Sequence, residues 1–234
     1  LSAMSEAVNT VGKQFAQPMR LLNKDGFPKK LLVERTIRDR RYVISDLFFS
    51  WFRRYSDVSI ARPGRHEVWH GDYREFLASH SGGIGCIYAD PPYTIDHYSR
   101  FYHVLETVAQ YDFPELALKK RNDRWEVMRG HYRTERHQSP FCIPSQAGRA
   151  FADLFAGANK FRAPMVLSYS PFTAGNQDRP RLVGLEELTK LAATYFSDVE
   201  VIEADGHIHR RLHSTSKNIS RLTNSEVFVV CRNR

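Results

Sequence analysis

The residues with the clearest chemical potential are the four from Asp90 to Tyr93, Asp-Pro-Pro-Tyr, which follow an apolar run over residues 84–89. This run predicts a short buried strand that ends in an acid, two prolines that make the next turn rigid, and an aromatic ring. The Asp90 carboxylate and the Pro91 carbonyl can both accept hydrogen bonds from one exocyclic amine, while Tyr93 stacks on the ring that carries it. An amine held in this way can attack a methyl donor.

The residues that follow make this pattern more specific. From Asp90 to Asp112 the chain reads Asp-Pro-Pro-Tyr-Thr-Ile-Asp-His-Tyr-Ser-Arg-Phe-Tyr-His-Val-Leu-Glu-Thr-Val-Ala-Gln-Tyr-Asp. This segment resembles the Dam-type class of DNA adenine-N6 methyltransferases, in particular restriction–modification members that continue into a Tyr-His-x-Leu-Glu-Thr helix. Three further segments resemble other elements of the family, namely Asn9–Pro18, Ser139–Cys142 and Val166–Tyr169.

The resemblance implies both a fold and an activity. The fold would be α/β and Rossmann-like, that of a class I methyltransferase, with a mostly parallel sheet and an antiparallel C-terminal strand. The activity would be transfer of a methyl group from S-adenosylmethionine to the N6 amine of an adenine flipped out of double-stranded DNA. The catalytic residues would be Asp90, Pro91, Pro92 and Tyr93, and a cognate restriction endonuclease would be a candidate partner.

A second acid, Asp72, follows the predicted strand over residues 67–70. Ligands of α/β sheets bind outside the carboxyl ends of strands. By resemblance to the family, Asp72 would accept a hydrogen bond from the adenine amine of S-adenosylmethionine, with Tyr73 or Phe76 beside the ring and Asp90 also near the cofactor. The alternative is that Asp72 simply caps the helix predicted over residues 73–78.

The family's cofactor loop, a Phe-x-Gly-x-Gly turn after the first strand, has no counterpart before Asp90. A circularly permuted arrangement would place it at Asp153–Asn159, but the second glycine is lacking there. Because Phe151, Leu154 and Phe155 recur at helical spacing, we predict a helix C-terminus instead. We therefore expect the two N-terminal strands of the fold to be missing, a gap in the sheet, and weak cofactor binding by this chain alone.

Composition is consistent with a nucleic-acid partner. The 234 residues include 34 Lys and Arg against 26 Asp and Glu, a formal net charge of +8, and the sequence pI is about 9.5. A basic surface favours phosphate backbones through counterion release. The cysteines Cys86, Cys142 and Cys231 form neither a disulfide framework nor a metal-binding pattern. With no apolar stretch of about 18 residues and no signal peptide, a soluble cytoplasmic protein without a membrane partner is expected.

Two parts of the chain are predicted, a helical, basic DNA-recognition segment over residues 1–65 and a catalytic domain over residues 66–234. The first would contain a helix that ends by Pro18, an irregular basic stretch over residues 19–35 and a long helix with apolar residues from Ile44 to Tyr55. The second would alternate strands over residues 67–70, 84–89, 164–169, 199–204 and 226–231 with helices over residues 73–78, 101–111 and 185–195 and one from residue 145.

Candidate DNA contacts lie in two basic segments. Residues 112–140 mix cations with aromatic rings, which suits phosphate contact and base stacking, although a mobile surface loop would look similar. Residues 207–217 contain three histidines, but arginines beside them would repel a metal ion and no fourth ligand lies at metal spacing, so a phosphate-binding loop is favoured over zinc. The residues that we expect to contact DNA are Lys119, Lys120, Arg121, Arg133, Arg210, Arg211 and Lys217.

Two other classes of function stay open at this point. The same pocket chemistry would serve an amino-methyltransferase that acts on cytosine N4, on RNA or on a protein amide, and only the methylated product distinguishes these. The second alternative is a binding-only or inactive remnant, because the cofactor loop is missing. Titration with S-adenosylmethionine would identify such a remnant.

Overall fold

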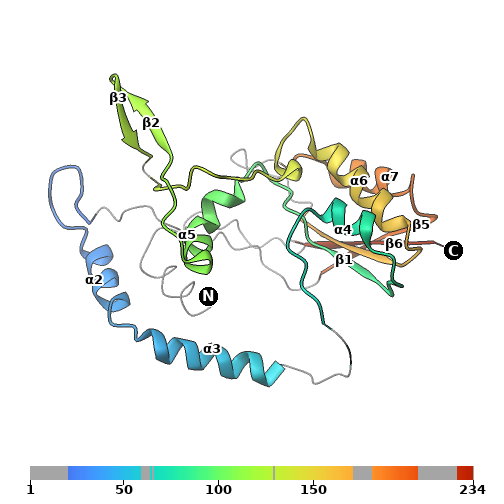
Figure 1. The fold of residues 1–234 in the computed structure, drawn as a ribbon, viewed down its shortest axis with the longest axis horizontal. Coiled ribbons are helices and arrows are strands. Elements are labelled where there is room, and N and C mark those ends of the chain that lie inside the picture. The colour runs from blue at the N-terminus through green and yellow to red at the C-terminus, as the bar shows by residue number, and fades with distance from the viewer. Residues whose placement is uncertain are drawn as a thin grey trace. The chain divides into compact units, whose positions relative to one another are not determined.

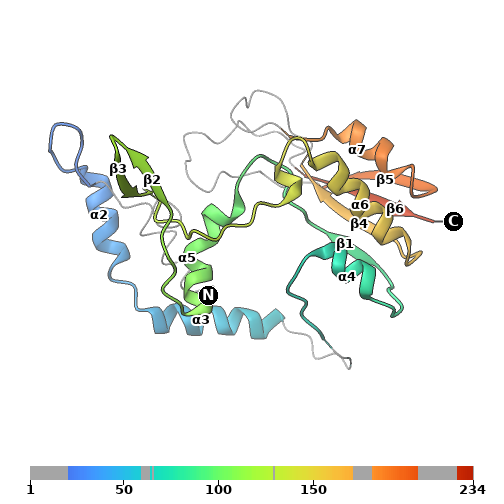
Figure 2. The same ribbon diagram turned by 45° about the horizontal axis from the view of Figure 1, so that its top comes forward.

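The structure is a computed structural model that describes residues 21–58, 64, 66–128, 130–170, 181–204 and 226–233. The chain divides into two compact units, of which the first comprises Leu1–Arg65 and Tyr98–His137 and the second comprises His66–His97 and Gln138–Arg234. Figures 1 and 2 show the elements of both units from two sides. The sequence predicted a DNA-recognition segment over residues 1–65 and a catalytic domain over residues 66–234. These assignments of function to the two parts stay predictions.

Some predicted features lie outside the described residues. These are the N-terminal helix that ends by Pro18, the family-like segment Asn9–Pro18, and the basic loop over residues 207–217 with Arg210, Arg211 and Lys217. The roles expected for them stay predictions.

The second unit is built on a four-stranded sheet with the order β1-β4-β6-β5. Its strands are β1 (Ile87–Ala89), β4 (Met165–Tyr169), β5 (Asp198–Glu203) and β6 (Val227–Arg232). Strand β1 is parallel to β4, whereas β6 is antiparallel to both of its neighbours. Three of the four described strands of this sheet therefore run in one direction, and β6 opposes them. A mixed α/β sheet is compatible with the Rossmann-like fold that the resemblance implied.

Strand β1 lies at an edge of this sheet and pairs with β4 alone among the described residues. The strand predicted over residues 67–70 is wrong, because these residues form no strand and Val68 is 98% exposed. This short segment was predicted as a strand from its residues alone, but a strand also needs a hydrogen-bonding partner. Direct pairing between this segment and β1, which would contradict the expected gap in the sheet, is not present; the gap itself stays a prediction.

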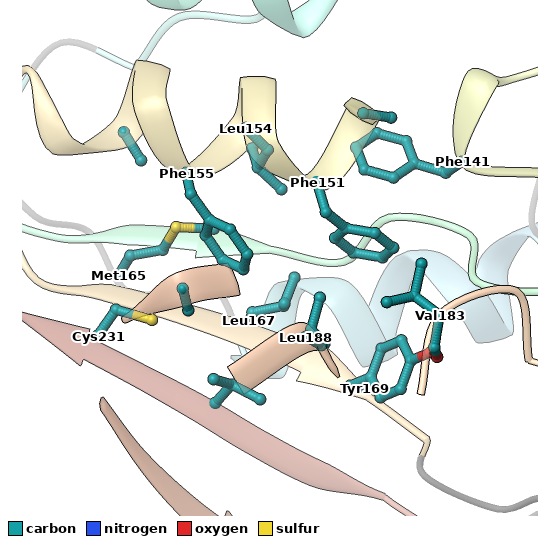
Figure 3. Packing of buried hydrophobic residues seen from close by; sticks show 14 of the residues in the cluster. Phe141, Phe151, Leu154, Phe155, Met165, Leu167, Tyr169, Val183, Leu188 and Cys231 are labelled. Atoms are coloured by element: carbon teal, nitrogen blue, oxygen red, sulfur yellow. The ribbon is translucent and has the colours of Figure 1, made fainter. Parts of the chain in front are cut away.

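The core of the second unit lies between the sheet and three helices, α4 (Tyr73–Ser79), α6 (Ala147–Asn159) and α7 (Leu185–Ala192). Figure 3 shows Phe151, Leu154 and Phe155 of α6 pointing toward Met165, Leu167 and Tyr169 of β4. The last three are completely buried and alternate along the strand, so one face of β4 is devoted to this contact. Each such side chain contributes about 1.5–3 kcal/mol by leaving water.

Helices α4 and α6 approach each other closely at Gly157. A Cβ atom on this glycine would lie 2.9 Å from Cδ1 of Leu77, so a larger residue would force the two helices apart. Gly157 lies within α6, which continues to Asn159. The prediction that Asp153–Asn159 is the end of a helix and not a cofactor loop is therefore confirmed.

The first unit contains three described helices and a hairpin. The helices are α2 (Lys30–Asp39), α3 (Ile44–Val58) and α5 (Tyr98–Gln110), and the hairpin joins β2 (Leu118–Arg121) to β3 (Arg124–Val127). Asn122 and Asp123 at its tip have φ of 46° and 59°. A two-residue turn of this left-handed kind matches the twist of the two strands, and Asn and Asp tolerate it.

Three expectations for this unit need correction. The stretch over residues 19–35 is not irregular throughout, because the strong helix formers from Lys30 onward begin α2. The long helix is confirmed as α3, which begins at Ile44, but none of its residues is buried. Residues 112–140 are not one irregular loop, because they contain the hairpin.

One ion pair ties the end of α5 to the segment that follows the hairpin. The Arg133 guanidinium donates to both carboxylate oxygens of Asp112, with nitrogen–oxygen distances of 2.6 and 2.7 Å. It also donates to Thr107 Oγ1 at 3.1 Å and to Gln110 Oε1 at 3.0 Å. The Arg133 side chain is only 12% exposed, so four hydrogen bonds from one cation fix this part of the chain.

The remaining elements follow the predicted ranges within a few residues. No helix within the described ranges is long and apolar enough to cross a bilayer.

The core packing predicts different costs for two otherwise identical substitutions. Val229 is completely buried in β6, whereas Val68 is 98% exposed. We expect Val229→Ala to lower the free energy of unfolding by about 2 kcal/mol or more, because apolar burial is lost and a cavity remains. Val68→Ala should change it by less than about 0.5 kcal/mol. Chemical denaturation of both variants tests this, and equal costs would contradict the described core.

The Arg133–Asp112 pair predicts a dependence of stability on pH. Hydrogen bonds from Arg133 are the main cause that lowers the pKa of Asp112. A carboxyl group with a lowered pKa stabilises the fold above its ordinary titration range, and this contribution is lost as the pH falls through the lowered pKa. Thermal unfolding should therefore show that Asp112→Asn lowers the melting temperature at neutral pH and has a much smaller effect in acid.

The exposed ion pair between Lys190 and Glu186 serves as the control, because its side chains are 73% and 81% exposed. We expect Lys190→Gln to change the melting temperature little at either pH, since solvent screens such pairs. An Asp112→Asn effect that is the same at neutral and acidic pH would contradict the assigned role of the pair.

Candidate active site

The Asp-Pro-Pro-Tyr turn leaves the carboxyl end of β1, where the sequence placed it. Asp90 is exposed, whereas Pro91, Pro92 and Tyr93 are partly buried. The carboxylate is thus accessible to a ligand while the residues after it are held against the protein. Such a turn combines an accessible hydrogen-bond acceptor with a fixed aromatic ring.

The Tyr93 ring contacts a second aromatic ring and a cation. Its centroid lies 5.1 Å from that of Tyr169 at an interplanar angle of 60°, and the guanidinium carbon of Arg181 lies 4.7 Å from the Tyr93 centroid. Burial raises the pKa of Tyr93, and the Arg181 cation opposes this rise only in part. The phenol therefore stays protonated at neutral pH, and the residue offers a neutral ring.

Four buried aromatic contacts connect Tyr93 with Tyr73. From Tyr169 the series continues to Phe151 at 6.1 Å, then to Phe141 at 4.9 Å and to Tyr73 at 5.4 Å. Figure 3 shows Phe151 on the side of α6 that faces β4, with Phe141 beside it and Tyr169 at the end of β4. Segments far apart in the sequence thereby meet at one edge of the core.

Asp72 is the N-cap of α4, which was the alternative to a cofactor role. Its Oδ1 accepts a hydrogen bond from the Arg74 backbone N–H at 2.8 Å. The Arg74 guanidinium donates to both carboxylate oxygens, from Nε at 3.0 Å and from Nη2 at 2.7 Å. The capping interpretation is therefore confirmed. A cofactor contact by Asp72 would require Arg74 to share or release this carboxylate.

Tyr73 also has a structural role. Its hydroxyl donates to the Ala150 carbonyl of α6 at 3.0 Å, and burial raises the pKa of Tyr73 to about 12. The ring thus packs into the contact between α4 and α6. Whether it also lies beside a cofactor stays a prediction.

The two buried thiols are poor nucleophiles. Burial raises the pKa of Cys142 to about 11 and that of Cys231 to about 12, so both remain protonated at neutral pH. This agrees with amine chemistry that needs no thiolate.

The cations of the hairpin lie on both of its faces. Lys119 is paired with Glu126, Lys120 with Trp125 and Arg121 with Arg124. Because side chains alternate along strands, Lys119 and Arg121 share one face and Lys120 lies with Trp125 on the other. All residues of both strands are exposed, and Trp125 is 67% exposed.

Arg133 differs from the hairpin cations, although the sequence placed it in the same group. Its hydrogen bonds to Asp112, Thr107 and Gln110 direct the guanidinium into the protein. Lys120 also has an acidic neighbour, Asp123 at 3.0 Å, but both side chains are more than half exposed. The hairpin cations are thus available for a polyanion, and Arg133 is much less so.

Sequence reasoning missed Arg181 and the aromatic series. Phe151 carried only a helical spacing, and Phe141 entered only as part of the family-like segment Ser139–Cys142. Arg181 had no signal at all, because neither a motif nor a periodicity includes it. The contacts of these residues join positions that are distant in sequence, and only the fold reveals them.

Comparison with known proteins agrees with this site. Residues 60–134 match the model of the D12 class N6 adenine-specific DNA methyltransferases. The chain is 34% identical over 139 residues to the modification methylase LlaI of Lactococcus lactis subsp. lactis. The aligned residues cover 59% of this chain and 19% of that protein. It is 38% identical over 105 residues to the type II methyltransferase M.FokI of Planomicrobium okeanokoites. This alignment covers 45% of this chain and 14% of that protein.

The chain therefore spans about a fifth or less of the length of these curated relatives. No solved structure matches the chain. The family match includes the Asp-Pro-Pro-Tyr turn and the hairpin, and the printed names of the relatives are a modification methylase and a type II methyltransferase. These findings confirm the resemblance noted in the sequence: residues 60–134 are similar to the D12 class N6 adenine-specific DNA methyltransferases, and parts of the chain are similar to two methyltransferases.

Proposed function

We propose that this chain provides the acceptor pocket of a site-specific DNA methyltransferase, which transfers a methyl group to the N6 amine of adenine. The observation that carries the proposal is the turn after β1, in which an exposed Asp90 precedes a Tyr93 ring held by Tyr169 and Arg181. The match of residues 60–134 to an adenine-specific family supports adenine over cytosine N4, RNA or protein amides as the substrate. Double-stranded DNA and a cognate restriction endonuclease are the proposed partners.

The pocket would act on a base that has left the duplex. Flipping a base costs a few kcal/mol, and stacking on an aromatic ring such as Tyr93 returns about 1–3 kcal/mol. Asp90 and the Pro91 carbonyl would accept the two hydrogens of the amine. This orients the nitrogen lone pair away from both acceptors and toward the incoming methyl group.

Asp90 would also respond to the change of charge during transfer. The amine nitrogen becomes positive as the new N–C bond forms, and a carboxylate beside it stabilises that charge. The same carboxylate can accept the proton that the methylated amine then releases. A thiolate nucleophile has no part in this reaction, in agreement with the protonated state of Cys142 and Cys231.

The expected methyl donor is S-adenosylmethionine, which supplies a methyl group on a sulfonium when bound. The residues that the sequence assigned to it, by resemblance to the family, are Asp72, Tyr73 and Asp90. Only Asp90 is exposed. Asp72 is held by Arg74 and Tyr73 by Ala150, so these two residues as arranged do not fit an adenine ligand. We therefore derive no step from them. Titration of the chain with S-adenosylmethionine tests whether it binds the donor or is a remnant without this capacity.

The hairpin is the proposed DNA contact. Lys119, Lys120 and Arg121 are exposed, and the Trp125 ring lies on the same face as Lys120. Cations attract the phosphate backbone and an exposed ring can stack on a base. Arg210, Arg211 and Lys217 remain proposed contacts outside the described residues. Arg133 is a weaker candidate, because its guanidinium is engaged by Asp112.

The amine pocket predicts that Asp90→Ala reduces methyl transfer by the intact protein by about 10²-fold or more, as loss of one key electrostatic group does. Asp90 is exposed, so the fold should be retained. Tyr93→Ala should also lower transfer, whereas Tyr93→Phe should be milder because the ring remains. The assay is transfer of labelled methyl groups to duplex DNA with identification of N6-methyladenine in the product.

Asp25 supplies the matched control, because it is an exposed acid outside the pocket. Asp25→Ala should leave transfer unchanged. Wild-type turnover by Asp90→Ala would refute the pocket, and equal losses from Tyr93→Ala and Tyr93→Phe would refute the stacking role. A product other than N6-methyladenine would assign the pocket to one of the alternative amines.

The hairpin predicts a change in the salt dependence of DNA binding. Neutralising Lys119, Lys120 and Arg121 together should weaken binding to duplexes of any sequence. The slope of log affinity against log salt should flatten by up to about three units, because each phosphate contact contributes about 0.9. Lys190→Gln removes an exposed cation outside the hairpin and should leave the slope unchanged. An unchanged slope in the triple variant would mean that the hairpin does not contact DNA.

A further inference from the structure

We propose that Arg181 is a positioning residue of the amine pocket, which fixes the Tyr93 ring in the orientation in which it stacks on the target base. The proposal rests on the proposed function of Tyr93 in holding a flipped base. Its starting point is the guanidinium carbon of Arg181, 4.7 Å from the centroid of the Tyr93 ring. A cation at this distance is attracted by the electron-rich face of the ring.

Arg181 is itself held rigidly. Its Nε donates to the Ser170 carbonyl at 2.6 Å, and its Nη2 donates to Ser170 Oγ at 2.8 Å. Ser170 is completely buried and directly follows β4. Two donors of a planar guanidinium bonded to one buried residue define the plane of the group as well as its position. The ring of Tyr93 therefore meets a fixed cation and not a mobile surface side chain.

The segment over residues 181–183, which contains Arg181, also holds Tyr169, the second residue that contacts the Tyr93 ring. The Tyr169 hydroxyl donates to the Val183 carbonyl, and Tyr169 is completely buried. Arg181 also forms an antiparallel bridge with Thr94, the residue after Tyr93. Residues 181–183 thus reach the Tyr93 region in three ways. The Arg181 backbone pairs with Thr94, the Arg181 side chain contacts the Tyr93 ring, and the Val183 carbonyl holds Tyr169 against that ring. Two anchored groups touch the Tyr93 ring, and together they restrict its rotamer.

The charge of Arg181 is compatible with this place. Methylation makes the target nitrogen positive, so an isolated cation nearby would oppose the reaction. Charges of both signs act on the Tyr93 phenol, because Arg181 lowers its pKa while the Glu226 and Asp90 carboxylates raise it. The guanidinium, directed to Ser170 and to the ring face, can therefore orient Tyr93 while the carboxylates offset its charge.

The test is a set of kinetic measurements on the intact protein. Arg181→Gln should lower kcat about ten- to a hundredfold, because a misplaced reacting group slows the step, and should leave KM for DNA within about twofold. Arg181→Lys should give a kcat between those of the unchanged protein and Arg181→Gln, since it keeps the cation but loses the paired hydrogen bonds to Ser170. In a Tyr93→Ala background, Arg181→Gln should have no further effect, because there is no ring left to orient. Arg232→Gln, which removes an arginine paired with Asp198 and Glu200, is the matched control and should leave kcat unchanged.

Additive effects of Arg181→Gln and Tyr93→Ala on kcat would overturn the proposal. A loss confined to KM, with a flatter salt dependence of DNA binding, would also overturn it and make Arg181 a phosphate contact.

Thermal unfolding of the unchanged protein, Arg181→Gln, Tyr93→Ala and the double variant covers the case in which the unchanged protein transfers no methyl group, which would refute the proposed function. Additive shifts of the melting temperature would then refute the contact as well. Coupled shifts without activity would make Arg181 a purely structural residue and overturn the positioning role.

Discussion

The amine pocket depends on the packing of α6 against β4. Phe151 and Phe155 leave water almost completely in this contact, and they define where β4 lies under the helix. Tyr169, the last residue of β4, contacts Phe151 on one side and Tyr93 on the other. The position of the motif's ring is therefore set by the core and not by the two prolines alone. A cavity in this contact would move the ring even if the turn itself were unchanged.

The turn after β1 separates two physical requirements. A carboxylate that receives an amine must be accessible, and Asp90 is exposed. A ring that stacks on a base must keep one orientation, and Tyr93 is partly buried between anchored neighbours. Asp90 and Tyr93 can face different environments although only two residues separate them, because Pro91 and Pro92 fix the direction of the chain between them. Helix α4 makes the opposite use of its acid, since Asp72 serves the cap and Arg74.

Local signals predicted most of the second unit. The apolar runs that became β4 and β6, and the helical spacing of Phe151, Leu154 and Phe155, depend on residues close in sequence. The strand predicted over residues 67–70 is wrong because a strand forms only where a partner strand is present, which the local sequence does not reveal. The hairpin was missed because its two strands are short, exposed and rich in charged residues, although Asn122 and Asp123 suited its turn. Arg181 could not be predicted, since its role depends on a contact with Ser170 across a segment without periodicity.

Only part of the basic residues can explain DNA binding, because several of the cations are already engaged by other residues of the protein. Arg133 is bound to Asp112, Arg74 to Asp72, Arg181 to Ser170 and Arg232 to two acids of β5. These guanidinium groups serve packing, capping and positioning, because their planar forks suit two simultaneous hydrogen bonds. Lys119, Arg121 and Arg124 of the hairpin are exposed instead. A net charge of +8 therefore does not describe one continuous surface. Exposure and existing partners, and not the count of cations, decide which of them can meet a phosphate.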